Sequence, residues 1–155
     1  MSMPTDPDPV TLDLERRVAA NPQDLEALLA LGHRYLEHQQ PARATETYQR
    51  VIDLDAQNRE AWTHLGLILF WDGRSDDALR VLDQVLADSP EYPEALFFKG
   101  VVLYEARQDY AGAVAAWEAY LAVTPPGQDT SQVRGLLQEA RARLVTVRGE
   151  REGTP

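Results

Sequence analysis

Three histidines are the residues whose type and spacing offer this sequence the most chemistry. His33 has Glu37 one helical turn after it, and His64 has Glu60 one turn before it. If His33 and His64 approached each other on adjacent helices, two imidazoles and a carboxylate could in principle hold zinc. We favour the simpler interpretation, in which both histidines are polar residues on the wall of a groove. His38 lies in the turn EHQQP and is expected to be exposed.

No other group of residues predicts catalysis. The 155 residues include no cysteine, which excludes disulfides, thiolate metal sites and cysteine nucleophiles. A phosphate-binding loop, a nucleophile elbow and an HExxH motif are all missing from the sequence. Acidic pairs such as Asp76 and Asp77 are typical of helix starts. The sequence therefore predicts a protein that is not an enzyme and that needs neither a cofactor nor a metal.

The charge of the chain restricts its partners. With 25 acidic and 15 basic residues, the formal net charge is -10. Such a surface repels a phosphate backbone, so we expect no nucleic-acid binding. It attracts a basic or amphipathic protein segment. No stretch approaches the roughly 20 apolar residues of a membrane span, so direct membrane insertion is not expected.

The elements that would position these residues follow an internal repeat. Gly32, Gly66 and Gly100 lie 34 residues apart, within the aligned segments ALLALGHRYL, AWTHLGLILF and ALFFKGVVLY. A glycine at a fixed place lets the second helix of a hairpin approach the first closely. The second helices would then contribute small and large residues to the crossings, namely Ala44, Ala78, Ala113, Tyr48, Leu82 and Trp117.

Turn and capping signals divide the chain into helices. Pro41 suits the first turn of a helix, whereas Ser75 and Asp109 are expected N-caps. We expect a single domain over residues 10–147 between disordered tails at 1–9 and 148–155. Its predicted parts are a helix at 10–21, three helix hairpins at 25–58, 59–92 and 93–127, and a capping helix at 131–147.

The repeat resembles the tetratricopeptide repeat, whose pattern is W-x2-L-G-x2-Y, then A-x3-F, then P. The middle unit matches it at Trp62, Leu65, Gly66, Ala78 and Pro90, whereas in the third unit Lys99 stands where leucine is usual. The resemblance covers about residues 25–127. It implies an all-α, right-handed superhelical solenoid whose first helices line a concave surface, where partner segments usually dock.

The first helix of each predicted hairpin carries a second, mostly apolar stripe beside the one that faces the core. We expect this stripe to form an apolar concave groove that binds a peptide or an amphipathic helix of a partner protein. The candidate residues are Leu29, His33, Leu36, Thr63, Leu67, Phe70, Trp71, Phe97, Val101 and Tyr104. In the alternative interpretation these residues pack on the N-terminal helix, on the flanking tail or on a second copy of the chain. The last of these would make the protein a self-associating scaffold.

The last unit also resembles the tetratricopeptide domains of bacterial cytochrome c-type biogenesis proteins. The matching residues are Ala113, Trp117, Glu118, Leu121, Pro125, Pro126 and Arg141. That resemblance implies binding of the C-terminal amphipathic helix of an apocytochrome beside the haem attachment machinery. As a complete chain the protein would be expected in the cytoplasm. As a domain of a membrane-anchored biogenesis protein, it would be expected in the periplasm.

Overall fold

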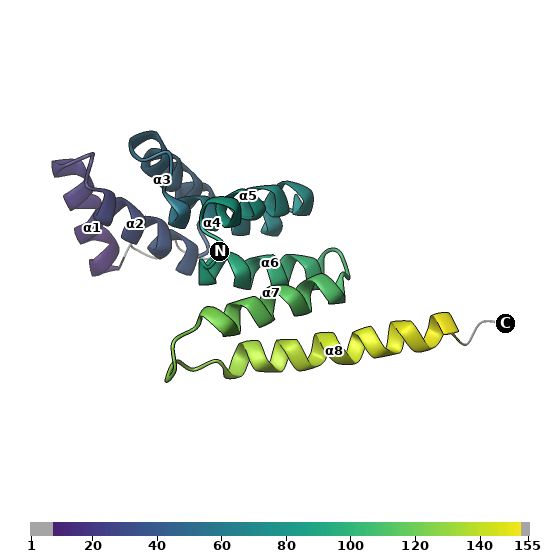
Figure 1. The fold of residues 1–155 in the computed structure, drawn as a ribbon. Helices are drawn as coiled ribbons and strands as arrows, with labels where there is room; N and C mark the ends of the chain where they lie inside the picture. Colours follow the sequence, from purple (N-terminus) through teal and green to yellow (C-terminus); the bar gives the residue numbers. More distant parts are fainter. Residues whose placement is uncertain (1–7, 153–155) are drawn as a thin grey trace. The chain divides into compact units, whose positions relative to one another are not determined.

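The computed structural model describes residues 8–152, and within that range the chain is all-α, with eight helices and no strand (Figure 1). The chain forms two compact units, residues 1–68 and 69–155, and the boundary between them falls inside the fourth helix. The helices are α1 (Pro9–Ala20), α2 (Leu25–Glu37), α3 (Pro41–Leu54), α4 (Arg59–Trp71), α5 (Ser75–Asp88), α6 (Pro93–Glu105), α7 (Tyr110–Val123) and α8 (Ser131–Glu152).

Both ends of the helical region extend further than the sequence predicted. Asp8 is the N-cap of α1 and Pro9 is its first residue, so the expected disordered tail is wrong at these two positions. Residues 1–7 lie outside the described part of the chain. At the other end α8 continues to Glu152, five residues past the predicted boundary. Arg148 and Glu150 are good helix formers, and the single Gly149 costs only about 1 kcal/mol.

The hairpin boundaries follow the repeat, but one of the predicted caps is wrong. Asp109 accepts a hydrogen bond from the backbone N–H of Gly112 at 2.9 Å, as an N-cap should. Pro41 occupies the first turn of α3, as predicted. Ser75 is already helical, and the residue before it, Arg74, caps α5 without a side-chain hydrogen bond. Asp76 and Asp77 nevertheless lie in the first turn of α5, where negative charge is favourable.

In the first unit, α2 packs against both α1 and α3. The ring of Tyr48 lies against Gly32 so closely that a Cβ added there would be 2.6 Å from it. Tyr48, Leu28 and Val51 are fully buried around this crossing. The glycine is therefore needed because a tyrosine ring occupies the space of its missing side chain.

Polar contacts also join the first three helices. The hydroxyl of Tyr35 donates to Glu15 at 2.8 Å, and Arg43 donates to the same carboxylate at 2.7 Å while lying over the Tyr35 ring. Burial, followed by the hydrogen bond to Glu15, raises the pKa of Tyr35 to about 12. Since Glu15 lies on α1, Tyr35 on α2 and Arg43 on α3, this cluster links all three helices.

The N-cap of α1 also contacts α2. Asp8 accepts hydrogen bonds from Thr11, and it forms ion pairs with Arg34 at 2.9 Å and His38 at 2.8 Å. The Thr11 hydroxyl, with smaller contributions from Arg34, holds the pKa of Asp8 well below its usual range. One carboxylate thus starts α1 and fastens it to α2.

In the second unit, α6 packs against α5 and α7, and α7 packs against α8. The indole of Trp117 lies on Gly100, where an added Cβ would be 2.2 Å from its Nε1 atom, and it donates to the carbonyl of Phe97 at 3.2 Å. Val133, Leu137 and Ala140 of α8 complete this core. α8 therefore covers the last apolar face of the repeats, as the capping helix was predicted to do.

Candidate functional site

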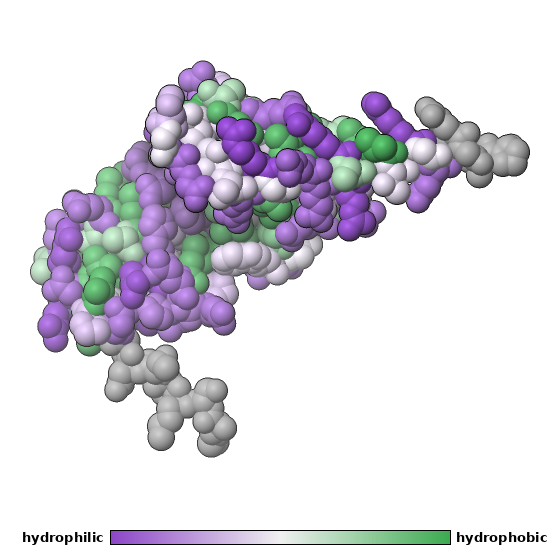
Figure 2. All heavy atoms as spheres, turned by 90° about the horizontal axis from the view of Figure 1, so that it is seen from below, coloured by the Kyte–Doolittle hydropathy of each residue, from purple (hydrophilic) through white to green (hydrophobic). Residues whose placement is uncertain are grey.

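We define the first-helix stripe as the ten candidate residues on α2, α4 and α6. Eight of them have half-buried side chains, namely Leu29, His33, Leu36, Leu67, Phe70, Phe97, Val101 and Tyr104. Trp71, at the end of α4, is 55% exposed. Thr63 is fully buried, and its hydroxyl donates to the carbonyl of Arg59, so it presents no surface to a partner. On the face shown in Figure 2, hydrophobic residues form separate patches in a mainly hydrophilic surface.

On α2, the stripe residues share their surface with the core. Leu29 and Leu36 pack against the buried cluster of the first unit, which includes Leu28 and Tyr48. Each keeps part of its side chain accessible. The α2 part of the stripe can therefore provide contact area without being a separate layer above the core.

On α6, the stripe residues touch the helices that follow. Phe97, Val101 and Tyr104 pack against the cluster formed by α7 and α8. The hydroxyl of Tyr104 donates to Glu139 of α8 at 2.6 Å, and this hydrogen bond raises the pKa of Tyr104. Tyr104 thus packs partly on α8. The accessible remainder of these side chains is what a partner could contact.

A polar cluster lies where the two histidines of the stripe region meet. The imidazole rings of His33 and His64 are 4.5 Å apart between centroids, and His64 stacks on Tyr48 at 5.2 Å. The Nε2 atom of His33 lies 3.2 Å from the Oε1 atom of Glu60. Of the two carboxylates considered from the sequence, Glu60 is the one that joins the cluster, because Glu37 is paired with Arg34.

This cluster contains buried polar atoms without hydrogen-bond partners. They are Nε2 of His33, whose angle to Glu60 does not make a hydrogen bond, and the hydroxyl of Tyr48. Burial, and then the charge of Glu60, raises the pKa of Tyr48 well above its ordinary value, so this tyrosine stays neutral. In residues 8–152, no group of three or more His, Asp or Glu side chains is arranged to hold a metal ion.

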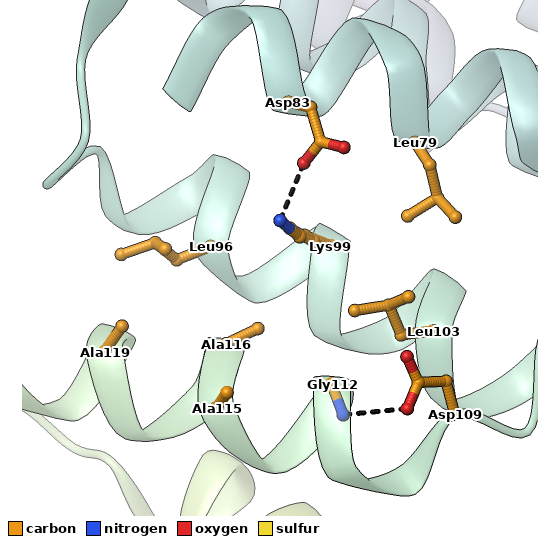
Figure 3. Close-up of a pocket in the computed structure, with 10 residues that line it drawn as sticks. All are labelled: Leu79, Asp83, Leu96, Lys99, Leu103, Asp109, Gly112, Ala115, Ala116 and Ala119. Carbon is orange, nitrogen blue, oxygen red and sulfur yellow. Dashed lines mark hydrogen bonds and ion pairs between the residues drawn. The ribbon is translucent and has the colours of Figure 1, made fainter. Parts of the chain in front are cut away.

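A groove on α5, α6 and α7 was not found from the sequence. It encloses about 480 Å³ and is lined by leucines, by small residues of α7 and by three charged side chains (Figure 3). The lysine that departs from the repeat pattern, Lys99, pairs there with Asp83 at 2.7 Å. The signal that could have revealed it is the run of small residues at helical spacing on α7, namely Gly112, Ala115, Ala116 and Ala119.

Comparison with known proteins agrees with the repeat pattern. Residues 29–78 and 72–129 match the tetratricopeptide repeat family. The chain is 26% identical over 140 residues to the cytochrome c-type biogenesis protein CycH of Pseudomonas aeruginosa. The matched region covers 88% of this chain and 34% of CycH. It is 23% identical over 124 residues to NrfG, a formate-dependent nitrite reductase complex subunit of Escherichia coli O157:H7, covering 77% and 62% of the two chains. The chain thus spans about a third of the length of CycH.

Solved structures show the same fold. Two crystal structures of MamA superpose with TM-scores of 0.62 and 0.61, at 24% and 25% sequence identity. They cover 92% and 86% of this chain, and 86% and 76% of the MamA chains. The predicted α-solenoid of helix hairpins is therefore confirmed. In the described residues, no helix is long and apolar enough to cross a membrane.

Proposed function

Because the chain belongs to the tetratricopeptide repeat family, we propose that it is a non-enzymatic interaction module that binds a peptide or amphipathic helix of another protein on its first-helix stripe. Proteins of this repeat family bind other proteins, and that coarser role applies to this chain. The proposal depends on the residues of this stripe, part of which each unit carries. Its members lie on α2 and α4 in the first unit, and on the end of α4 and on α6 in the second.

The observation that carries the proposal is the exposure of Trp71. Among the described residues, the large hydrophobic side chains that are exposed are Val10, Leu12, Leu54, Trp71 and Val145, and the tryptophan is the one aromatic member. Tryptophan is enriched among the residues that dominate binding energy at protein interfaces. An exposed indole that continues a stripe of half-buried apolar residues is therefore the best starting point for a partner surface.

The proposed partner is a basic amphipathic helix. The net charge of -10 favours a segment that carries lysines or arginines. The similarity to CycH, a cytochrome c-type biogenesis protein, supports a role in cytochrome c biogenesis, with the C-terminal helix of an apocytochrome as the segment bound. The similarity to NrfG, a subunit of the formate-dependent nitrite reductase complex, supports a role for the chain within a larger assembly.

Tryptophan fluorescence tests this proposal. When a synthetic C-terminal helix of an apocytochrome c is titrated into the protein, we expect the emission to shift to shorter wavelength, because bound peptide removes Trp71 from water. Trp117 is fully buried and Trp62 half-buried, so most of the shift should come from Trp71. The Trp71→Phe variant should bind the peptide, as measured by calorimetry, without the shift.

Self-association is the competing explanation for the same exposed residue. If a second copy covers the stripe, the wild-type chain sediments as a concentration-dependent dimer, and the apocytochrome peptide causes no shift. Replacing Trp71 by aspartate would then give a monomer. That combination would contradict the proposed partner binding and support a self-associating scaffold.

A further inference from the structure

We propose that Glu60 selects a basic partner: its carboxylate receives a lysine or arginine of the bound helix, and protonation of His33 competes with that cation. This inference rests on the proposed function and names the chemistry by which the stripe recognises its ligand. It concerns the first unit, in which α2 and α4 bring Glu60, His33 and His64 together.

Glu60 is not one of the ten stripe residues, but it lies on the same face of α4 as two of them. Thr63 and Leu67 follow it at three and seven residues, a spacing that keeps side chains on one helix face. The Glu60 side chain is 37% exposed, and that of His33 beside it is 39% exposed. A carboxylate thus lies at the start of an otherwise apolar run, within reach of a segment that covers that run.

Within residues 8–152, no lysine or arginine forms an ion pair with this carboxylate. In the described part of the first unit, Asp8, Asp24, Glu15 and Glu37 each pair with an arginine. The ion-pair contact of Glu60 is to His33, which is charged only when protonated. Behind the carboxylate, the Tyr48 hydroxyl is neutral and has no hydrogen-bond partner. A lysine or arginine supplied by the partner would therefore complete a charge pair that the fold leaves unmade.

A protonated His33 would itself supply the cation that pairs with Glu60. The groups that face this imidazole are Tyr48 on α3 and Glu60 and His64 on α4, while Glu37 on its own helix is engaged by Arg34. A proton on His33 places a positive charge 3.2 Å from Glu60. Acidification favours the protonated form of an imidazole, so affinity for a basic helix should be lower at pH 5.5 than at pH 8.

The first test compares two helical peptides of identical pattern, one of leucine and lysine and one of leucine and glutamine. At pH 8 and low salt, the wild-type protein should bind the lysine peptide more tightly. The Glu60→Gln variant should lose about two- to fivefold of that affinity, the range for an ion pair that remains partly exposed to water. The matched control is Glu46→Gln, an exposed change on α3 that alters the net charge equally and should have little effect.

The second test follows the binding of the lysine peptide from pH 8 to pH 5.5. The wild-type affinity should fall with pH, and that fall should be largely lost in His33→Gln, whose helicity is checked by circular dichroism. The inference is wrong if Glu60→Gln binds the lysine peptide as wild type does, or if His33→Gln keeps the full pH dependence. Should both peptides bind wild type while Glu60→Gln changes nothing, the proposed function stands without this inference. Should neither peptide bind, the proposed function itself fails.

Discussion

Replacing Gly100 by alanine is expected to lower the free energy of unfolding by about 1–3 kcal/mol, the cost of overpacking a filled core. The added Cβ would be 2.2 Å from Nε1 of Trp117 and 2.6 Å from two carbons of the same ring. Trp117 is fully buried and donates to the carbonyl of Phe97, so the indole cannot move aside without losing that bond. Equilibrium denaturation in urea measures the effect.

The same substitution at Gly135 is the matched control. Gly135 also lies inside a helix, α8, but a Cβ added there has no atom within 4 Å. Since alanine favours helices over glycine by about 1 kcal/mol, Gly135→Ala should stabilise the protein by up to that amount. The opposite signs of the two changes separate close packing from helix propensity. A neutral Gly100→Ala would mean that α6 and α7 are less closely apposed than the structure shows.

Replacing Trp71 by aspartate is expected to weaken binding of the apocytochrome helix by roughly thirtyfold or more, since tryptophans at interface centres contribute about 2 kcal/mol or more. The side chain is 55% exposed at the end of α4, so its loss should leave the fold intact. Calorimetric titration measures the affinity. Far-UV circular dichroism and thermal melting check that helicity and stability are kept.

Val145→Asp provides the comparison for this change. Val145 lies on α8 and is 72% exposed, so its replacement removes an exposed apolar side chain and adds the same charge. It is outside the first-helix stripe and should leave binding close to the wild-type affinity. Equal losses from the two variants would show that the added negative charge, and not the position of Trp71, determines the result.

The repeat pattern was enough to predict the fold because spacing encodes the helix crossings. Gly32 and Gly100 were expected to let the second helix approach the first closely, and the rings of Tyr48 and Trp117 lie directly against these glycines. The hairpin boundaries followed from turn residues in the same way. Each of these features depends on one helix and its sequence neighbour, so a period of 34 residues describes it completely.

Features that depend on which neighbour covers a side chain were harder to predict. Thr63 lies on the face of its helix that the stripe occupies. Its position around the helix does not show, however, that residues elsewhere in the fold bury it. The ion-pair partners of Asp8 could not be predicted, because Arg34 and His38 are more than 25 residues away along the chain. The groove on α5, α6 and α7 depends on the space left by small residues of α7, whose helical spacing is visible in the sequence but does not show that the neighbouring helices leave this space open.

The histidines illustrate both situations. That they could approach each other on adjacent first helices was a possibility raised from the sequence, and in the structure their ring centroids lie 4.5 Å apart. The choice of Glu60 over Glu37 could not be predicted, because it depends on Arg34 holding Glu37. An internal ion pair thus determines which carboxylate is left to face the stripe.

Mapping where a bound helix lies tests the central claim most directly. An apocytochrome C-terminal helix that carries a photoreactive leucine can be cross-linked to the protein, and the attachment sites can be identified by mass spectrometry. We predict attachment to first-helix stripe residues, above all Leu67, Phe70 and Trp71 of α4. Attachment to the groove on α5, α6 and α7, at Ala115 or Ala119 for example, would contradict the proposed binding surface.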